Sequence, residues 1–186
     1  NFKYRDTLVK NAESFYANRA NFVYNNTCAF DFSNPSENIS SWKTGGKYHL
    51  DDNFLMQMLL MGYSYSNIDF EKLTSRKKNS SASWALPYIS YEAKMARYFV
   101  EQGWVLDDVD YTNFSNIEPG DILFWDSDDI NNNEFMACSH TSICVGKTNG
   151  VNYMIEGHTT GVIRRVPIRD RDVNQLLFVG RINLSK

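Results

Sequence analysis

Apolar residues recur at three- and four-residue steps near the start of the chain, which is the spacing of one face of a helix. The stripe is widened by Tyr16 and Val23, and the segment runs to about Asn25-Asn26. The residues at these steps are Leu8, Ala12, Phe15, Arg19 and Phe22, all of them apolar except Arg19. The pattern therefore predicts a first helix that packs one side against a core.

Two more helices are predicted before residue 104. Residues 51–62, DDNFLMQMLLMG, begin with Asp51 and Asp52 and end with Gly62, residue types preferred at helix starts and ends. Apolar residues almost encircle this short helix, so we expect it to be buried on most sides. A polar loop is expected at 74–83, and an amphipathic helix at 89–102, ended by Gly103.

The second half of the chain changes to strand patterns. The turn at Pro119-Gly120 precedes an apolar run at 122–125, and further strands are predicted at 140–145, 152–156, 162–166 and 176–182. A short extended stretch, KYHL, is also expected at 47–50. Helices followed by consecutive strands indicate an α+β fold. We expect a single domain over 1–186, with a helical part to about 117 and a β-sheet part from about 118.

Composition narrows the class of protein. Of the 186 residues, 42% are hydrophobic and 15% aromatic, typical of a globular domain, and the net charge of -3 argues against a nucleic-acid partner. The three cysteines, Cys28, Cys138 and Cys144, have no metal-type spacing and are expected to be buried free thiols. No apolar run is long enough to span a membrane, so no membrane partner is expected. The start of the chain lacks the apolar segment of a signal peptide, and we expect a mature chain or a fragment of a larger protein.

Four segments follow one another along the chain: HLDDNFLMQMLLMG at the second predicted helix, EPGDILFW at 118–125, SHTSICVG at 139–146, and YMIEGHTTGVIRRVPI at 153–168. Their order resembles that of the NlpC-type, papain-like peptidases of bacterial peptidoglycan. Together the four segments cover about residues 47–182. The long insertion between the helix and the PGD strand looks like versions of the family found in bacteriophage tail and lysis proteins.

The resemblance implies a papain-like fold, with N-terminal helices packed on a central antiparallel sheet or half-barrel of about five strands. It implies peptidoglycan or its stem peptides as ligand, other phage structural proteins as further partners, and an extracellular or virion-associated location. No cofactor or metal is implied. By position, Asp52 stands at the family's nucleophile, His140 is the base, and Glu156 or His158 is the residue that orients the imidazole.

Asp52 departs from the family, which has a cysteine at this helix start. A carboxylate is a much weaker nucleophile toward an amide than a thiolate, and it would form a mixed anhydride. Loss of a nucleophile typically removes several orders of magnitude of rate, so we predict little or no peptidase activity. Asp52 still places a negative charge at a helix N-terminus, where it is stabilised. Two origins fit: a natural pseudoenzyme, favoured by the neighbouring Asn53, or an engineered removal of a reactive cysteine.

Each candidate also has a structural interpretation. Asp51 and Asp52 suit a helix N-cap, His140 suits a strand histidine bonded to backbone, and Glu156 and His158 suit a turn. His49 is expected at an exposed rim, and Asp121 is expected to fix the turn before its strand. Five aromatic residues are candidates for a ligand groove, with core packing as the alternative: Trp42, Tyr48, Trp84, Tyr88 and Trp125.

Four functions remain open from the sequence. The first is an inactive peptidase-like domain that still binds wall peptide or glycan. The second is an active hydrolase, either with its cysteine replaced artificially or with another mechanism. The third is a metal site built from Asp52, His140, Glu156 and His158, whose spacing matches no recognised zinc motif. The fourth is a structural module of a larger assembly.

Overall fold

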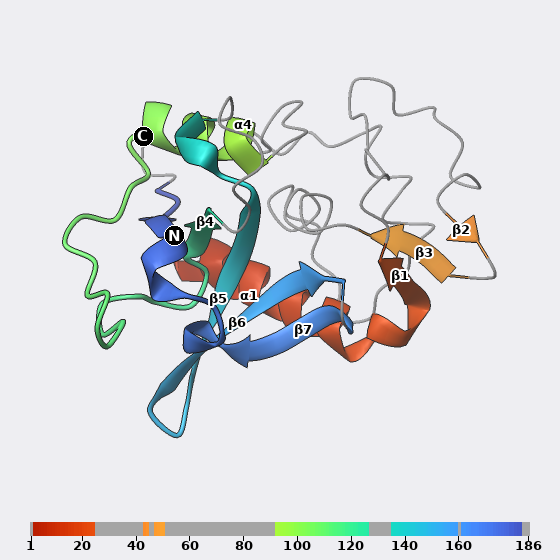
Figure 1. The fold of residues 1–186 in the computed structure, drawn as a ribbon. Coiled ribbons are helices and arrows are strands. Elements are labelled where there is room, and N and C mark those ends of the chain that lie inside the picture. The colour runs from red at the N-terminus through yellow and green to blue at the C-terminus, as the bar shows by residue number, and fades with distance from the viewer. Residues whose placement is uncertain are drawn as a thin grey trace.

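The computed structural model describes residues 2–24, 43–44, 47–50, 92–126, 135–159 and 161–183. For residues 2–4, 43–44 and 47–50 it describes the backbone alone. The predicted helix at 51–62 and the loop at 74–83 therefore lie outside the described residues. Within the described ranges, two α-helices and two sheets are present (Figure 1).

The larger sheet has five antiparallel strands in the order β7-β6-β5-β4-β8. This confirms the prediction of an α+β fold with an antiparallel sheet of about five strands. The strands are β4 (Ile122–Trp125), β5 (His140–Thr148), β6 (Val151–His158), β7 (Val162–Pro167) and β8 (Leu176–Gly180).

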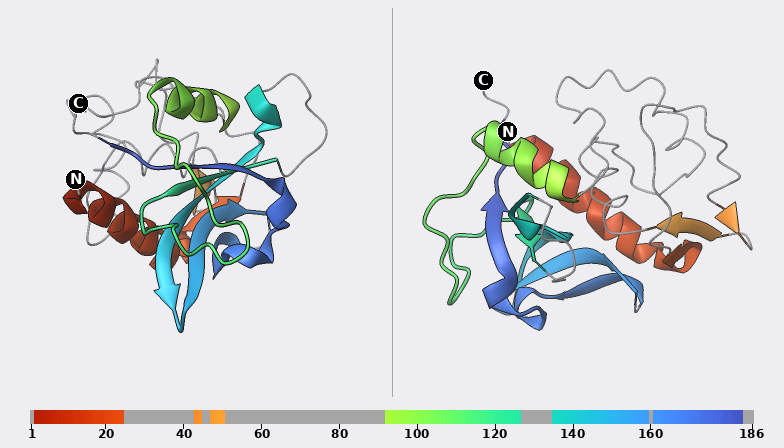
Figure 2. Two further views of the ribbon diagram at one scale, coloured as in Figure 1. Left: turned by 90° about the vertical axis from the view of Figure 1, so that its left-hand side faces the viewer. Right: turned by 45° about the horizontal axis from the view of Figure 1, so that its top comes forward.

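The β5–β6 hairpin is longer than predicted, because its pairing continues to Thr148 opposite Val151. Asn149 and Gly150 connect the strands with φ of 51° and 78°. Two positive φ values are typical of a tight hairpin turn whose twist matches that of the strands. Figure 2 shows the hairpin projecting beyond the rest of the sheet.

The first helix is shorter than predicted. Helix α1 (Phe2–Ala17) is followed by a 3-10 turn, η1 (Arg19–Asn21), and by strand β1 (Phe22–Tyr24). The Asn18 side chain donates to the carbonyl of Ser14 at the end of α1. Phe22 still reaches the core, because the 3-10 turn redirects the chain and the Phe22 ring lies 5.5 Å from that of Phe15. Its helical spacing was therefore misleading.

Strand β1 belongs to a second, three-stranded sheet that the sequence did not predict as a unit. Its order is β1-β3-β2, with β2 (Lys43–Thr44) antiparallel and β1 parallel to β3 (Lys47–Leu50). The expected extended stretch at 47–50 is confirmed as β3. The part before residue 118 is consequently not purely helical, because these strands lie within it.

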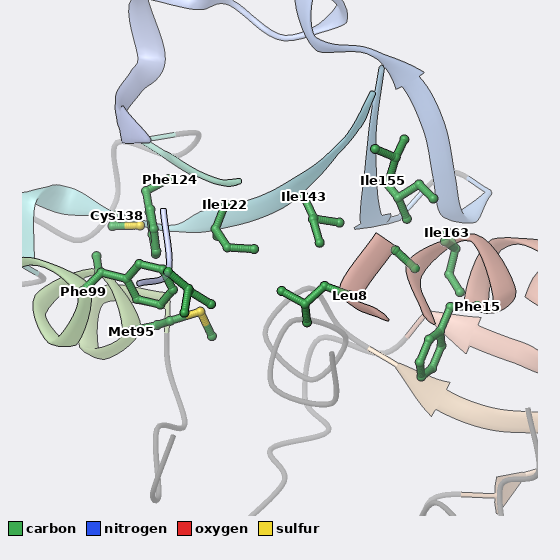
Figure 3. Close-up of a cluster of buried hydrophobic side chains, with 14 of the residues drawn as sticks. Leu8, Phe15, Met95, Phe99, Ile122, Phe124, Cys138, Ile143, Ile155 and Ile163 are labelled. Carbon is green, nitrogen blue, oxygen red and sulfur yellow. The ribbon is translucent and has the colours of Figure 1, made fainter. Parts of the chain in front are cut away.

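Both helices pack on one face of the five-stranded sheet. Helix α4 (Glu92–Glu101), within the predicted 89–102, buries Met95 and Phe99. Helix α1 contributes Leu8 and Phe15, and these side chains meet alternate residues of the strands (Figure 3). The strand residues of this cluster include Ile122, Phe124, Ile143, Ile155, Ile163 and Phe178.

The residues between them along each strand form a second buried cluster on the opposite face, as strand geometry requires. Leu123, Trp125, Cys144 and Met154 belong to it. The segment after α4 covers this cluster with Phe114 and Ile117, and the 3-10 turn η5 (Ile168–Asp170) adds Ile168. His140 shares this face, because it lies four residues before Cys144 on β5.

The turn before β4 is held as expected for Asp121. Its carboxylate accepts from the backbone N–H of Glu118 at 2.8 Å and from Arg181 Nε at 2.9 Å. Gly120 has a φ of 92°, which the third residue of a Pro-Gly turn requires. Asp121 therefore joins the start of β4 to the segment that follows β8.

Candidate functional site

A buried histidine–glutamate pair lies on the sheet face opposite the helices. His140 begins β5 and Glu156 lies near the end of β6. His140 Nε2 is 2.6 Å from Glu156 Oε2, and the two side chains are 2% and 0% exposed. The pair therefore lies inside the molecule, where water does not compete for the hydrogen bond.

Two arginines complete the site by binding the same carboxylate. Arg164 Nε and Nη2 reach Glu156 Oε1 at 3.1 and 2.5 Å, and Arg171 Nε reaches Oε2 at 2.7 Å. Arg164 lies directly opposite Glu156 in the β6–β7 ladder, so the strand register positions it. Arg171 directly follows η5, which contacts β6. We call these four residues the Glu156 cluster.

Trp125 lies beside the Glu156 cluster on the same face of the sheet. Trp125 lies opposite His140 in the β4–β5 ladder, and its Nε1 donates to Ser142 Oγ at 2.8 Å. The guanidinium of Arg171 is 5.9 Å from the centre of the Trp125 ring. The indole thus satisfies its own donor and presents its face to a cation.

Glu156 is ionised in this environment. Burial by itself raises the pKa of a carboxyl, but here the hydrogen bond and charge of His140, together with Arg171 and Arg164, outweigh burial and lower the pKa of Glu156 from 4.5 to about 2. A buried carboxylate with this set of donors is a fixed acceptor for the imidazole.

The two candidates for the residue that orients His140 lie in different places. Glu156 is within hydrogen-bond distance of the imidazole, and His158 is partly exposed at the last position of β6. Its two-residue distance from Glu156 made the two candidates equivalent in sequence. The catalytic roles of His140 and Glu156 stay predictions, because a contact does not establish a reaction.

Several predicted site residues cannot be placed. Asp52 lies outside the described residues, and so do Trp42, Trp84 and Tyr88; for Tyr48 only the backbone in β3 is described. Trp125 is fully buried, which agrees with the core-packing alternative, and contact with a ligand stays a prediction for it.

Arg164, Arg171 and Ser142 were not among the residues predicted for the site. Arg164 had a usable signal, since pairing the strands around Gly161 places it opposite Glu156. Arg171 had none, because it approaches through an irregular turn. Ser142 was identifiable only as a residue that shares the face of His140.

The two described cysteines are buried free thiols, as predicted, while Cys28 lies outside the described residues. Burial is the main cause that raises the pKa of Cys144 to about 12. Cys138 Sγ lies 3.7 Å from the carbonyl oxygen of His140. The Cys144 thiol is therefore not activated as a nucleophile, since the thiolate is the reactive form.

Comparison with known proteins finds no matching family model, no matching curated protein and no matching solved structure. Among the described residues, no three His, Cys, Asp or Glu side chains are grouped so as to hold a metal ion. No helix in the described ranges has both the length and the apolar character needed to cross a membrane.

Proposed function

We propose that this chain is an NlpC-type, papain-like peptidase domain directed at bacterial peptidoglycan, with Asp52 at the nucleophile position and little or no hydrolytic activity. It would retain binding of wall peptide or glycan, in an extracellular or virion-associated assembly such as a phage tail. The observation that carries the proposal is the buried hydrogen bond between His140 and Glu156.

This pair is what a papain-like mechanism needs from the β-sheet. A base must have its imidazole oriented by a third group, and Glu156 contacts only one of the two ring nitrogens, Nε2. Proton exchange with a nucleophile or leaving group would then use Nδ1. The ordered motifs support the same interpretation, since the strand after the PGD turn pairs directly with the strand of His140.

The expected inactivity follows from the chemistry of Asp52. An aspartate has no nucleophile proton for His140 to remove near neutral pH, and its carboxylate attacks an amide poorly. Restoring a thiol at this position should restore the reaction if the remaining parts are in place. Asp51 provides a matched control, since it is the same residue type one position away.

The test uses purified peptidoglycan incubated with the unaltered chain, Asp52→Cys and Asp51→Cys, followed by analysis of the released peptides. We expect release by Asp52→Cys alone, and loss of that release when His140→Ala is added. Sedimentation with insoluble wall material measures binding by the unaltered chain.

Two results would contradict the proposal. Cleavage by the unaltered chain would reject the predicted inactivity. Absence of both cleavage by a folded Asp52→Cys variant and sedimentation of the unaltered chain with wall material would reject a wall-directed peptidase domain and favour a structural module.

A further inference from the structure

Resting on the proposed function, we infer that Arg164 and Arg171 are positioning residues that act on His140 through Glu156. Together they make both oxygens of Glu156 obligatory acceptors, so that the imidazole keeps its proton on Nε2 and exchanges protons only at Nδ1. The two arginines were not among the predicted site residues, and their contacts with Glu156 come from the structure.

The first step is the donor and acceptor count. A guanidinium only donates and does not lose its proton in proteins. Arg164 donates twice to Oε1, and Arg171 donates once to Oε2. A protonated Glu156 would carry a hydrogen on an oxygen that already faces such a donor. Both oxygens are therefore held as acceptors.

The second step concerns the direction of the bond to His140. Arg171 and His140 Nε2 share Oε2, at 2.7 and 2.6 Å. Because this oxygen accepts from Arg171, it has no hydrogen to give, and Nε2 must be the donor to it. The lone pair of the neutral ring is then on Nδ1, the nitrogen suited to act as a base.

Burial limits which groups can donate hydrogen bonds to the Glu156 carboxylate. Glu156 is fully buried, so water cannot substitute for a lost donor. The groups described around its carboxylate come from three places: His140 on β5, Arg164 on β7 and Arg171 after η5. Without the arginines, the burial cost of the carboxylate would be opposed by the imidazole alone.

The first measurement uses the unaltered chain and needs no activity. Two-bond 15N–1H spectra report which ring nitrogen of His140 carries the proton once the ring is neutral. We expect hydrogen on Nε2 and a bare Nδ1. Hydrogen on Nδ1 in the neutral ring would overturn the inference, whatever the behaviour of any variant.

The second measurement tests the arginines. In Arg164→Gln, Arg171→Gln and the double variant, we expect the carboxyl of Glu156, followed by 13C NMR, to titrate at least about one pH unit higher than in the parent. Lysine in place of either arginine should return the titration of Glu156 most of the way to that of the parent. Arg165→Gln is the matched control, because Arg165 is adjacent in β7 but pairs with Glu13. An unchanged titration in the folded double variant would overturn the inference.

The third measurement separates this inference from the proposed function. In Asp52→Cys, addition of Arg171→Gln should lower kcat at least tenfold with KM nearly unchanged, whereas Arg165→Gln should change neither. If Asp52→Cys is inactive but the spectra are as expected, the proposed function fails and the positioning assignment stands. If Asp52→Cys is active and Arg171→Gln leaves kcat unchanged, the positioning role fails and the function stands.

Discussion

At the scale of single residues, Glu156 combines full burial with a negative charge and three ionisable partners. It is a fully buried carboxylate that accepts from one histidine and two arginines. Removing one partner from a buried ionic group leaves the others uncompensated, which usually costs more than the intact group contributes. Its contribution to stability is therefore measurable without any assumption about function.

Glu156→Gln should lower the free energy of unfolding by about 3–5 kcal/mol, because two partly buried arginines lose their buried counter-charge. Urea denaturation measures this change. Glu13→Gln is the matched control: Glu13 also binds an arginine, but its side chain is 38% exposed, and the expected loss is below about 1 kcal/mol. Equal losses in the two variants would show that burial of Glu156 does not increase its contribution to stability.

The pKa of Glu156 predicts an acid-dependent part of stability. A carboxyl whose pKa is lowered from 4.5 to about 2 on folding stabilises the protein above pH 4.5 and loses this effect as pH falls toward 2. The difference in unfolding free energy between the parent and Glu156→Gln should thus shrink by roughly 3 kcal/mol over that window. A difference that is constant with pH would contradict an ionised Glu156.

At the scale of elements, the close approach of α4 to β8 is the tightest packing contact among the described glycines. A Cβ on Gly180 would collide with the ring of Phe99 and lie 3.0 Å from Cε2 of Phe124. Neither ring can move easily, because Phe99 is edge-on to Trp104 and Phe124, and Phe124 stacks on Phe178 at 4.4 Å. The glycine is required here for space.

Gly180→Ala should therefore destabilise the protein by about 1–3 kcal/mol through overpacking. Thermal and urea unfolding measure the loss, and Val100→Ala, on the exposed side of α4, is the control expected within about 0.5 kcal/mol of the parent. In Gly180→Ala, a further Phe99→Leu change should cost less than it does alone, because it removes the collision. Additive losses would argue against this contact.

At the scale of the whole molecule, α1 joins parts of the chain that are far apart in sequence. It lies against β5, β6 and β7 (Figure 1). Its Glu13 pairs with Arg165 at 3.0 Å, and its Arg5 pairs with Glu118 at 2.5 Å. The N-terminal segment therefore covers the back of the sheet that carries the Glu156 cluster on its other face.

Leu8→Ala should lower the free energy of unfolding by about 2–5 kcal/mol, since Leu8 is fully buried in the cluster between α1 and the sheet. Lys10→Ala on the exposed side of α1 is the control, expected within about 0.5 kcal/mol. A small effect of Leu8→Ala on denaturation would mean that α1 is not part of the cooperative core.

The sequence by itself determined the class of fold and most strand positions, because the period of apolar residues reports which residues share a face. It also singled out His140, with Glu156 or His158 as the residue that orients it. Only the tertiary structure decided that Phe22 reaches the core after a 3-10 turn, that Glu156 contacts the imidazole, and that Arg171 joins them. The physical reason is that periodicity encodes only local geometry, whereas these contacts depend on strand register and irregular turns that bring distant residues together.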